Sequence, residues 1–235
     1  MNIIIIANGQ FPVLHHVLQL FDCADQVVCC DGAFEKYFRW CQQSGNSHPQ
    51  VSIVGDGDSL VPTLLDESRL SGMAVVGEVV SEQESNDLSK AVHYAVIQAR
   101  KQVANDCEIH IDILGATGLR EDHTLGNISL LAYYTTLFPK IEFRMVSDYG
   151  VFLPMRGRRS FVSYAGQQVS VFSFTPTVPV SVSGLRYPIA NRCLTWLWEG
   201  TLNESLGDTF EVSGGTLVVY QEGELERWGE LKNDN

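Results

Sequence analysis

Short apolar runs alternate with helical patterns through residues 1–148, and this alternation constrains the fold more than any other feature. The runs are rich in β-branched residues, which favour strands. Strands that alternate with helix-length segments are typical of a parallel sheet covered by helices. We expect strands at residues 2–7, 26–30, 51–54, 74–80, 108–114 and 141–147. The sequence therefore predicts an α/β domain over residues 1–150.

The segments between these runs have helical spacing. The clearest helix begins at Asn86, where apolar residues from Leu88 to Ala99 fall on one stripe. Ser85 or Asn86 is suited to cap it. We expect helices near residues 12–21, 32–41, 62–70, 86–104 and 122–137.

Beyond residue 150 the sequence changes to short alternating runs separated by Gly and Pro, which is typical of antiparallel sheets. We expect strands at residues 150–153, 160–164, 168–174, 194–198, 208–212 and 216–221. Residues 151–235 are therefore predicted to form a smaller all-β sandwich domain.

Composition narrows the class of protein. With 235 residues, 45% of them hydrophobic, the chain can bury a large core. A formal charge of −12 opposes binding to a nucleic-acid backbone, and no apolar run approaches a membrane span. The six cysteines lack zinc-type spacing. We interpret them as mostly reduced core residues of a cytoplasmic protein with no nucleic-acid or membrane partner.

Asp56 and Asp58 lie on a glycine-bracketed turn directly after the run 51–54. Carboxylates at the end of a strand suit Mg²⁺, which takes oxygen ligands and the phosphates of a substrate. An ordinary Asp-Gly surface turn is the alternative interpretation. The residues that follow the other predicted strands decide between a metal site and an ordinary turn.

Polar residues also follow the other predicted strands, and ligands of an open parallel sheet bind beyond the carboxyl ends of its strands. Taken singly, each residue is explained by the preference of helix first turns for acidic residues or of loops for glycine. Taken together, they favour a phosphate-handling site. The residues are Asn8, Gly9, Asp31, Asp87, Lys90, Gly115, Arg120, Asp122 and His123.

Residue types suggest the chemistry. Asp56 and Asp58, with Asp31 and Asp87 as further candidates, would hold Mg²⁺, while Lys90 and Arg120 would neutralise phosphates. The amides of the Gly115–Gly118 segment suit phosphate oxygens. Asp122 or His123 would position or deprotonate an attacking hydroxyl.

The chain resembles the thiamine pyrophosphokinase family in five collinear motifs. Residues 30–33 resemble C-A-D-G-G-A, residues 55–59 resemble G-D-F-D-S, and residues 86–90 resemble T-D-x-x-K. Residues 118–123 resemble G-G-R-x-D-H, and residues 200–205 resemble G-x-S-N-E. Leu119, Asn86 and Leu202 depart from the pattern, which puts substrate affinity and nucleotide choice in question.

The resemblance implies a Mg²⁺-dependent transferase that moves pyrophosphate from ATP to thiamine, giving thiamine diphosphate and AMP. It implies a homodimer with active sites at the subunit interface. Asp31, Asp56, Asp58 and Asp87 would serve Mg²⁺ and the triphosphate. Asn8, Gly9, Lys90, Gly115, Arg120 and His123 would bind the nucleotide. Gln83, Asp122, Trp196, Trp198, Asn203, Glu204 and Ser205 would lie at the substrates.

Thiamine is cationic and flat, so a tryptophan face suits it. Because side chains alternate along a strand, we expect only one of Trp196 and Trp198 to face the ligand, with Trp196 favoured. Two other functions stay open. One is a metal-dependent glycosyl- or nucleotidyltransferase, since an Asp-x-Asp at a strand end also serves sugar nucleotides. The other is a non-catalytic thiamine or nucleotide sensor.

Overall fold

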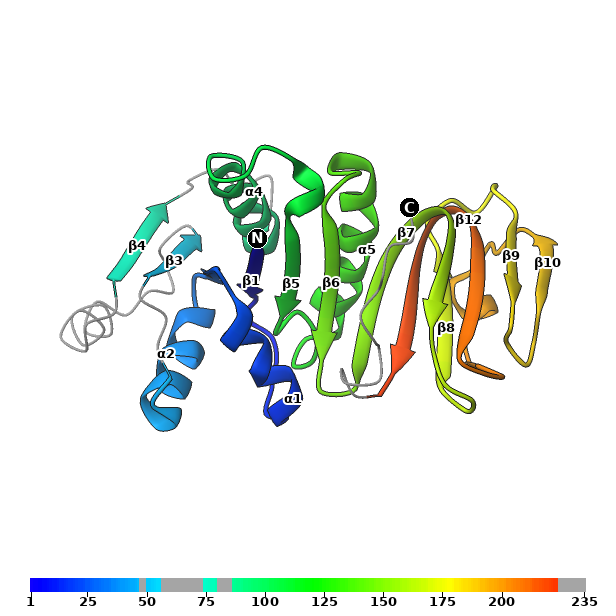
Figure 1. Ribbon diagram of the computed structural model, residues 1–235, viewed down its shortest axis with the longest axis horizontal. Helices are drawn as coiled ribbons and strands as arrows, with labels where there is room; N and C mark the ends of the chain where they lie inside the picture. The colour runs from blue at the N-terminus through cyan, green and yellow to red at the C-terminus, as the bar shows by residue number, and fades with distance from the viewer. Residues whose placement is uncertain (47–49, 56–73, 80–85, 224–235) are drawn as a thin grey trace. The chain divides into compact units, whose positions relative to one another are not determined.

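The computed structural model describes residues 1–46, 50–55, 74–79 and 86–223 (Figure 1). These residues divide into two compact units. The first contains Met1–Asn127 and Lys140–Glu142, and the second contains Ile128–Pro139 and the described residues from Phe143 onward. The helix predicted over residues 62–70 lies outside the described ranges.

The first unit contains a parallel sheet in the order β5-β1-β2-β3-β4. The strands are β1 (Asn2–Ile6), β2 (Gln26–Cys30), β3 (Gln50–Gly55), β4 (Ala74–Val79) and β5 (His110–Leu114). Ile3 to Ile6 are all buried, as expected for a strand covered on both faces. The alternation in the sequence therefore predicted this sheet correctly.

Helices α2 (Ala33–Ser44) and α4 (Asp87–Ala99) both pack on the strands of this sheet. In chain order, α2 follows β2, and α4 precedes β5. The side chain of Asn86 caps α4 by accepting a hydrogen bond from the amide of Ser89 at 2.9 Å, which confirms one of the two predicted caps. No helix among the described residues is long and apolar enough to cross a membrane.

Among the described residues up to Leu137, three shorter helical elements and one long helix accompany α2 and α4. The helix predicted at residues 12–21 is instead α1 (His15–Leu18) followed by the 3₁₀ turn η1 (Gln19–Cys23), because Leu14 is still extended. A second 3₁₀ turn, η2 (Asp106–Glu108), precedes β5. Helix α5 (Glu121–Leu137) agrees with the prediction to within one residue.

The second unit is antiparallel, in the order β10-β9-β12-β7-β6. Strand β12 pairs with β9 along Glu211–Ser213 and with β8 along Leu217–Gln221, so β9 and β8 share the side of β12 that β7 leaves open. The remaining bounds are β6 (Glu142–Ser147), β7 (Gly150–Val162), β8 (Gln168–Ser173), β9 (Val180–Ser183), β10 (Ile189–Arg192), β11 (Asn203–Glu204) and β12 (Thr209–Glu222). The predicted class, an α/β domain followed by an all-β sandwich, is confirmed.

Glycines misled the prediction of strand ends in this unit. Residues 150–153 and 160–164 belong largely to one strand, β7, and residues 208–212 and 216–221 to one strand, β12. Gly157 and Gly214 pair with each other across these two strands, and a bulge between Gly214 and Thr216 absorbs the irregularity. The glycines therefore bend long strands rather than ending them.

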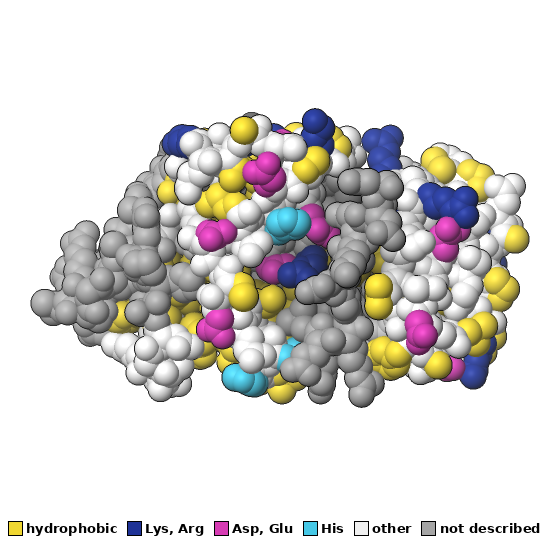
Figure 2. Space-filling view, viewed as in Figure 1, with side chains coloured by type: hydrophobic (Ala, Val, Ile, Leu, Met, Phe, Trp, Pro, Cys, Tyr) yellow, Lys and Arg dark blue, Asp and Glu magenta, His cyan; other side chains and the backbone are white. Residues whose placement is uncertain are grey.

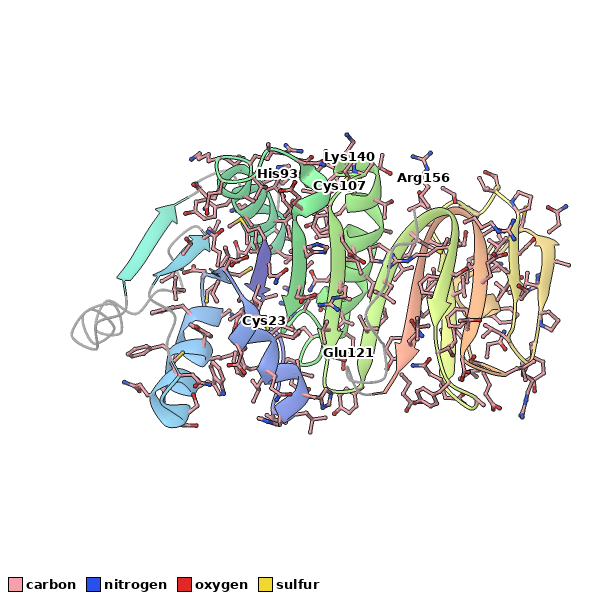
Figure 3. All side chains as sticks on the ribbon, in the orientation of Figure 1. Cys23, His93, Cys107, Glu121, Lys140 and Arg156 are labelled. Carbon is pink, nitrogen blue, oxygen red and sulfur yellow. The ribbon has the colours of Figure 1, made fainter. Side chains whose placement is uncertain are left out.

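All six cysteines are free. Cys29, Cys30 and Cys41 are buried as expected, whereas Cys23, Cys107 and Cys193 are exposed; Cys23 and Cys107 are labelled in Figure 3. The expectation of a mostly buried set was wrong for Cys23 and Cys193, because apolar neighbours in sequence do not ensure burial of the thiol.

Candidate functional site

The sheet of the first unit has its topological switch point between β1 and β5. The chain leaves β1 toward β2 on one side, while β5 lies on the other side of β1. Ligands of open α/β sheets bind at this position, beyond the carboxyl ends of the strands. The turn after β1 contains Asn8 and Gly9, and the turn after β5 contains Gly115 and Arg120. The topology thus brings these predicted residues to one edge.

The two turns are bonded to each other through their backbones. The amide of Gly9 donates to the carbonyl of Gly115 at 2.6 Å, and the amide of Gln10 donates to that of Thr117 at 2.8 Å. A Cβ atom at Gly9 would lie 2.4 Å from the Gly115 carbonyl oxygen, so only glycine fits there. Gly115 itself has φ +64°, which also favours glycine.

Lys36 on α2 is a residue of this edge that the sequence interpretation missed. Its ammonium donates to the carbonyl of Asn8 at 2.9 Å and to that of Gly9 at 2.8 Å. Partial burial lowers the pKa of Lys36, and Glu35 opposes that shift. Its place in the helix following Asp31 was the only signal in the sequence, and it does not distinguish Lys36 from a surface lysine.

Asp31 and Asp87 belong to neighbouring parts of the same edge. Asp31 follows β2 and is 2% exposed, and its amide donates to the carbonyl of Val54 at 3.1 Å. Asp87 is the first residue of α4. Burial raises the pKa of the Cys30 thiol, and the negative charges of Asp87 and then Asp31 raise it further. Both carboxylates therefore lie close enough to act on one thiol.

Gly55, at the end of β3, lies directly against Asp31. A Cβ atom at Gly55 would approach the Cβ atom of Asp31 to 2.6 Å. The glycine of the predicted metal motif thus leaves room for the carboxylate that follows β2. Asp56 and Asp58 themselves, like Gln83, lie outside the described residues.

Lys90 is buried one turn into α4, with 4% of its side chain exposed. Its ammonium lies 3.9 Å from a carboxylate oxygen of Asp87, whose side chain is 46% exposed. A buried ammonium beside a carboxylate at the start of a helix is a fixed positive charge at the strand edge. This geometry suits a phosphate.

Arg120 and Asp122 form a forked ion pair on the surface. The guanidinium donates to the two oxygens of Asp122 at 3.1 and 2.6 Å, and both side chains are about two-thirds exposed. These bonds hold the pKa of Asp122 below its usual value. Glu121, which lies between them and begins α5, is labelled in Figure 3. The exposed His123 donates its backbone amide to Asp122 at 3.0 Å.

Leu119, just before this pair, has φ +61° and is 69% exposed. A left-handed conformation is strained for leucine. Having Leu119 where the motif G-G-R-x-D-H has glycine therefore costs conformational free energy in the backbone. The side chain does not fill a core position in return.

Trp196 and Trp198 lie in the second unit and are both exposed, by 66% and 71%. The strand predicted at residues 194–198 was wrong, and with it the argument that only one tryptophan is outward. The chain instead turns into a 3₁₀ helix, η3 (Leu197–Gly200). The carboxylate of Glu199 accepts hydrogen bonds from the amides of Thr195 at 2.7 Å and Trp196 at 2.8 Å, which stabilises the turn.

Asn203 and Ser205, which follow η3 in the chain, are buried, and their side chains bond the backbone of nearby residues. The amide nitrogen of Asn203 donates to the carbonyl of Tyr187 at 2.7 Å, and its oxygen accepts from the amide of Tyr187 at 3.0 Å. The Ser205 hydroxyl donates to the carbonyl of Gly207 at 3.0 Å. Glu204 pairs with Arg186 at 3.0 Å. Contact of these three residues with a ligand stays a prediction.

Gly200→Ala is expected to destabilise the second unit by about 2–4 kcal/mol, because a Cβ atom there would lie 2.1 Å from the carbonyl oxygen of Val171. Gly207→Ala is the matched control, since nothing lies within 4 Å of its Cβ position. Urea denaturation measures both. Equal midpoints for the two variants would contradict the close packing of η3 on β8.

The carboxylates of Asp31 and Asp87 are hard oxygen donors and fit a Mg²⁺ ion that bridges to phosphates. Among the residues described, no group of three or more His, Cys, Asp or Glu side chains is arranged to hold a metal. Asp56 and Asp58, two of the predicted metal ligands, lie outside those residues, so Asp31 and Asp87 are only part of the predicted ligand set. The face drawn in Figure 2 carries acidic side chains interspersed with a few basic ones.

Comparisons with known proteins agree on one family. Residues 17–144 match the family described as "Thiamin pyrophosphokinase, catalytic domain", and residues 150–220 match "Thiamin pyrophosphokinase, substrate-binding domain". Thiamine pyrophosphokinase 3 of rice (Oryza sativa subsp. japonica) is 30% identical over 62% of this chain and 54% of its own length. Thiamine pyrophosphokinase 1 of rice is 25% identical over 82% and 75%. The match thus spans about half of the first relative.

Solved structures show the same fold. Thiamin pyrophosphokinase from Candida albicans superposes with a TM-score of 0.76 at 19% identity, covering 94% of this chain and 88% of that one. Yeast thiamin pyrophosphokinase superposes with a TM-score of 0.77 at 13% identity, covering 96% and 87%.

Proposed function

Because the chain belongs to the thiamin pyrophosphokinase family, we propose that it transfers the pyrophosphoryl group of ATP to the hydroxyl of thiamine, giving thiamine diphosphate and AMP. The observation that carries the proposal is the gathering of Asp31, Asp87 and Lys90 at the carboxyl edge of the sheet, beside the switch point between β1 and β5.

The nucleotide is proposed to bind at that edge. The buried ammonium of Lys90 is suited to hold phosphate oxygens, and the exposed guanidinium of Arg120 offers a forked contact. The bonded turns at Asn8–Gly9 and Gly115 form the floor, with His123 at the start of α5. Holding the triphosphate and the hydroxyl in line accounts for much of the catalysis of such a transfer.

Asp31 and Asp87, with Asp56 and Asp58, are the proposed residues for Mg²⁺. The ion, when bound, neutralises phosphate oxygens and so assists attack at the β-phosphorus. An acidic protein of net charge −12 needs such a cation, because carboxylates alone repel a triphosphate. Asp122 is the proposed residue that orients the thiamine hydroxyl, with Gln83 at the substrate.

Thiamine is proposed to bind partly through the second unit. We propose a substrate-binding domain of residues 151–235 after a catalytic domain of residues 1–150, which the family match over residues 150–220 supports. Two exposed tryptophan faces suit a cationic aromatic ligand. Asn203, Glu204 and Ser205 are the proposed polar residues near this ligand, and their bonds hold the local backbone in place. A homodimer with active sites at the subunit interface, in the cytoplasm, completes the proposal.

Product analysis tests this function. The protein with ATP, Mg²⁺ and thiamine is expected to form thiamine diphosphate and AMP in equal amounts, and EDTA is expected to abolish both. Formation of ADP with thiamine monophosphate would overturn the reaction type. Tight binding of thiamine without release of AMP would favour a sensor, and turnover of a sugar nucleotide without thiamine would favour a glycosyltransferase.

A further inference from the structure

Lys36 holds two successive carbonyl groups with one ammonium. The carbonyl oxygens of Asn8 and Gly9 accept hydrogen bonds from Lys36 Nζ at 2.9 and 2.8 Å. Bonds from a charged donor are about twice as strong as neutral ones. The turn after β1 is therefore fixed by a side chain of α2, a helix that follows it by more than twenty residues.

The Asn8–Gly9 and Gly9–Gln10 peptide units are each held on the amide side as well as on the carbonyl side. In a trans peptide the C=O and N–H groups point in opposite directions. The carbonyl of Asn8 points to Lys36, and the amide of Gly9 points to the carbonyl of Gly115 at 2.6 Å. In the next unit, the carbonyl of Gly9 points to Lys36 and the amide of Gln10 to the carbonyl of Thr117 at 2.8 Å.

These contacts join α2, the turn after β1 and the turn after β5 into one chain of hydrogen bonds at the switch point. The orientation of both peptide planes matters, because a reversed plane would turn its carbonyl oxygen toward that of Gly115 or Thr117 and lose both of its hydrogen bonds. Lys36 draws these oxygens to itself and offsets their negative dipoles. Its side chain is half-buried, so the contact is shielded in part from water.

We propose that Lys36 is a positioning residue for the nucleotide: it locks the Asn8–Gly9 turn, and through it the Gly115–Thr117 turn, in the shape that receives the triphosphate. This role rests on the proposed function. Lys36 acts through the backbone of these turns and needs no contact with the reacting atoms.

Lys36→Met tests the role, because methionine keeps an apolar stem but has no donor. Hydrogen exchange of the Gly9 and Gln10 amides is expected to be accelerated about tenfold, while the amides of Ile3–Ile6 stay protected. The KM for Mg-ATP is expected to rise about tenfold, with the KM for thiamine nearly unchanged. Lys101→Met, at an exposed lysine that bonds only to Gln98 among the described residues, is the control and should change neither quantity.

Lys36→Arg keeps the charge and several donors, and it is expected to restore much of the amide protection and of the nucleotide affinity. This variant keeps the proposal testable where Lys36→Met fails to fold. Unchanged exchange at Gly9 and Gln10 in Lys36→Met, or equal rises in KM for both substrates, would overturn the positioning role. Absence of thiamine-dependent turnover in the unmodified protein would instead count against the proposed function. Hydrogen exchange at Gly9 and Gln10 would still show whether Lys36 fixes the two turns.

Discussion

Asp31→Asn is expected to reduce kcat/KM for Mg-ATP by a factor on the order of a thousand while the protein stays folded. The substitution keeps the shape of the side chain and removes its negative charge at the centre of the proposed phosphate edge. Asp31 is 2% exposed, and it shares the neighbourhood of the Cys30 thiol with Asp87. A neutral amide cannot replace a carboxylate that serves a divalent ion.

The stability of this variant separates chemistry from folding. Removing the charge of Asp31 relieves its repulsion with the neighbouring Asp87, so we expect the thermal midpoint to stay the same or to rise. Asp22→Asn, at an exposed aspartate outside the edge, is the matched control and should keep full activity. Steady-state kinetics and a thermal melt are the measurements. Full turnover in Asp31→Asn at ordinary Mg²⁺ concentrations would contradict the assignment.

Lys90→Met is expected to lower kcat/KM by about a hundredfold or more, because it removes a fixed positive charge from the phosphates. The Lys90 side chain is 4% exposed, so solvent cannot readily replace the lost charge. Its neighbour Asp87 is 46% exposed and can be hydrated once the partner is gone. Replacing a buried charge by an apolar chain of similar length is often tolerated, so we expect the fold to persist.

Lys140→Met is the matched control for Lys90→Met, because Lys140 is an exposed lysine on the loop after α5 (labelled in Figure 3). Calorimetric titration with Mg-ATP and steady-state rates measure the two variants side by side. Loss of nucleotide affinity in Lys90→Met alone is the expected outcome. Equal affinities in both variants would remove Lys90 from the phosphate site.

The first unit was predictable because its signals are local. The run at residues 26–30 became β2 with the same bounds, and Asn86 caps α4 as its residue type indicates. A strand buried on both faces must be continuously apolar, so its sequence identifies it without knowledge of its partners. The second unit was less predictable, because strand pairing spans long separations in sequence.

Gly157 and Gly214 illustrate the difference. Each fell in a gap between two predicted strands, yet the two pair across β7 and β12 and let both strands continue. At residues 194–198, alternation predicted a strand, whereas the carboxylate of Glu199 turns the chain and leaves both tryptophans exposed. An alternating pattern shows neither the partner across a sheet nor the side chain that bonds a backbone amide.

By itself, the sequence determined the class of fold, the order of its two parts and the residue types available for phosphate chemistry, since these depend on local periodicity and on motifs. Only the tertiary structure decided which strand ends meet, that Asp31 and Asp87 lie near one thiol, and that Lys36 holds the turn after β1. The physical reason is that contacts between distant segments follow from sheet order and helix packing. A lysine that bonds backbone carbonyls has the same sequence signature as one in solvent.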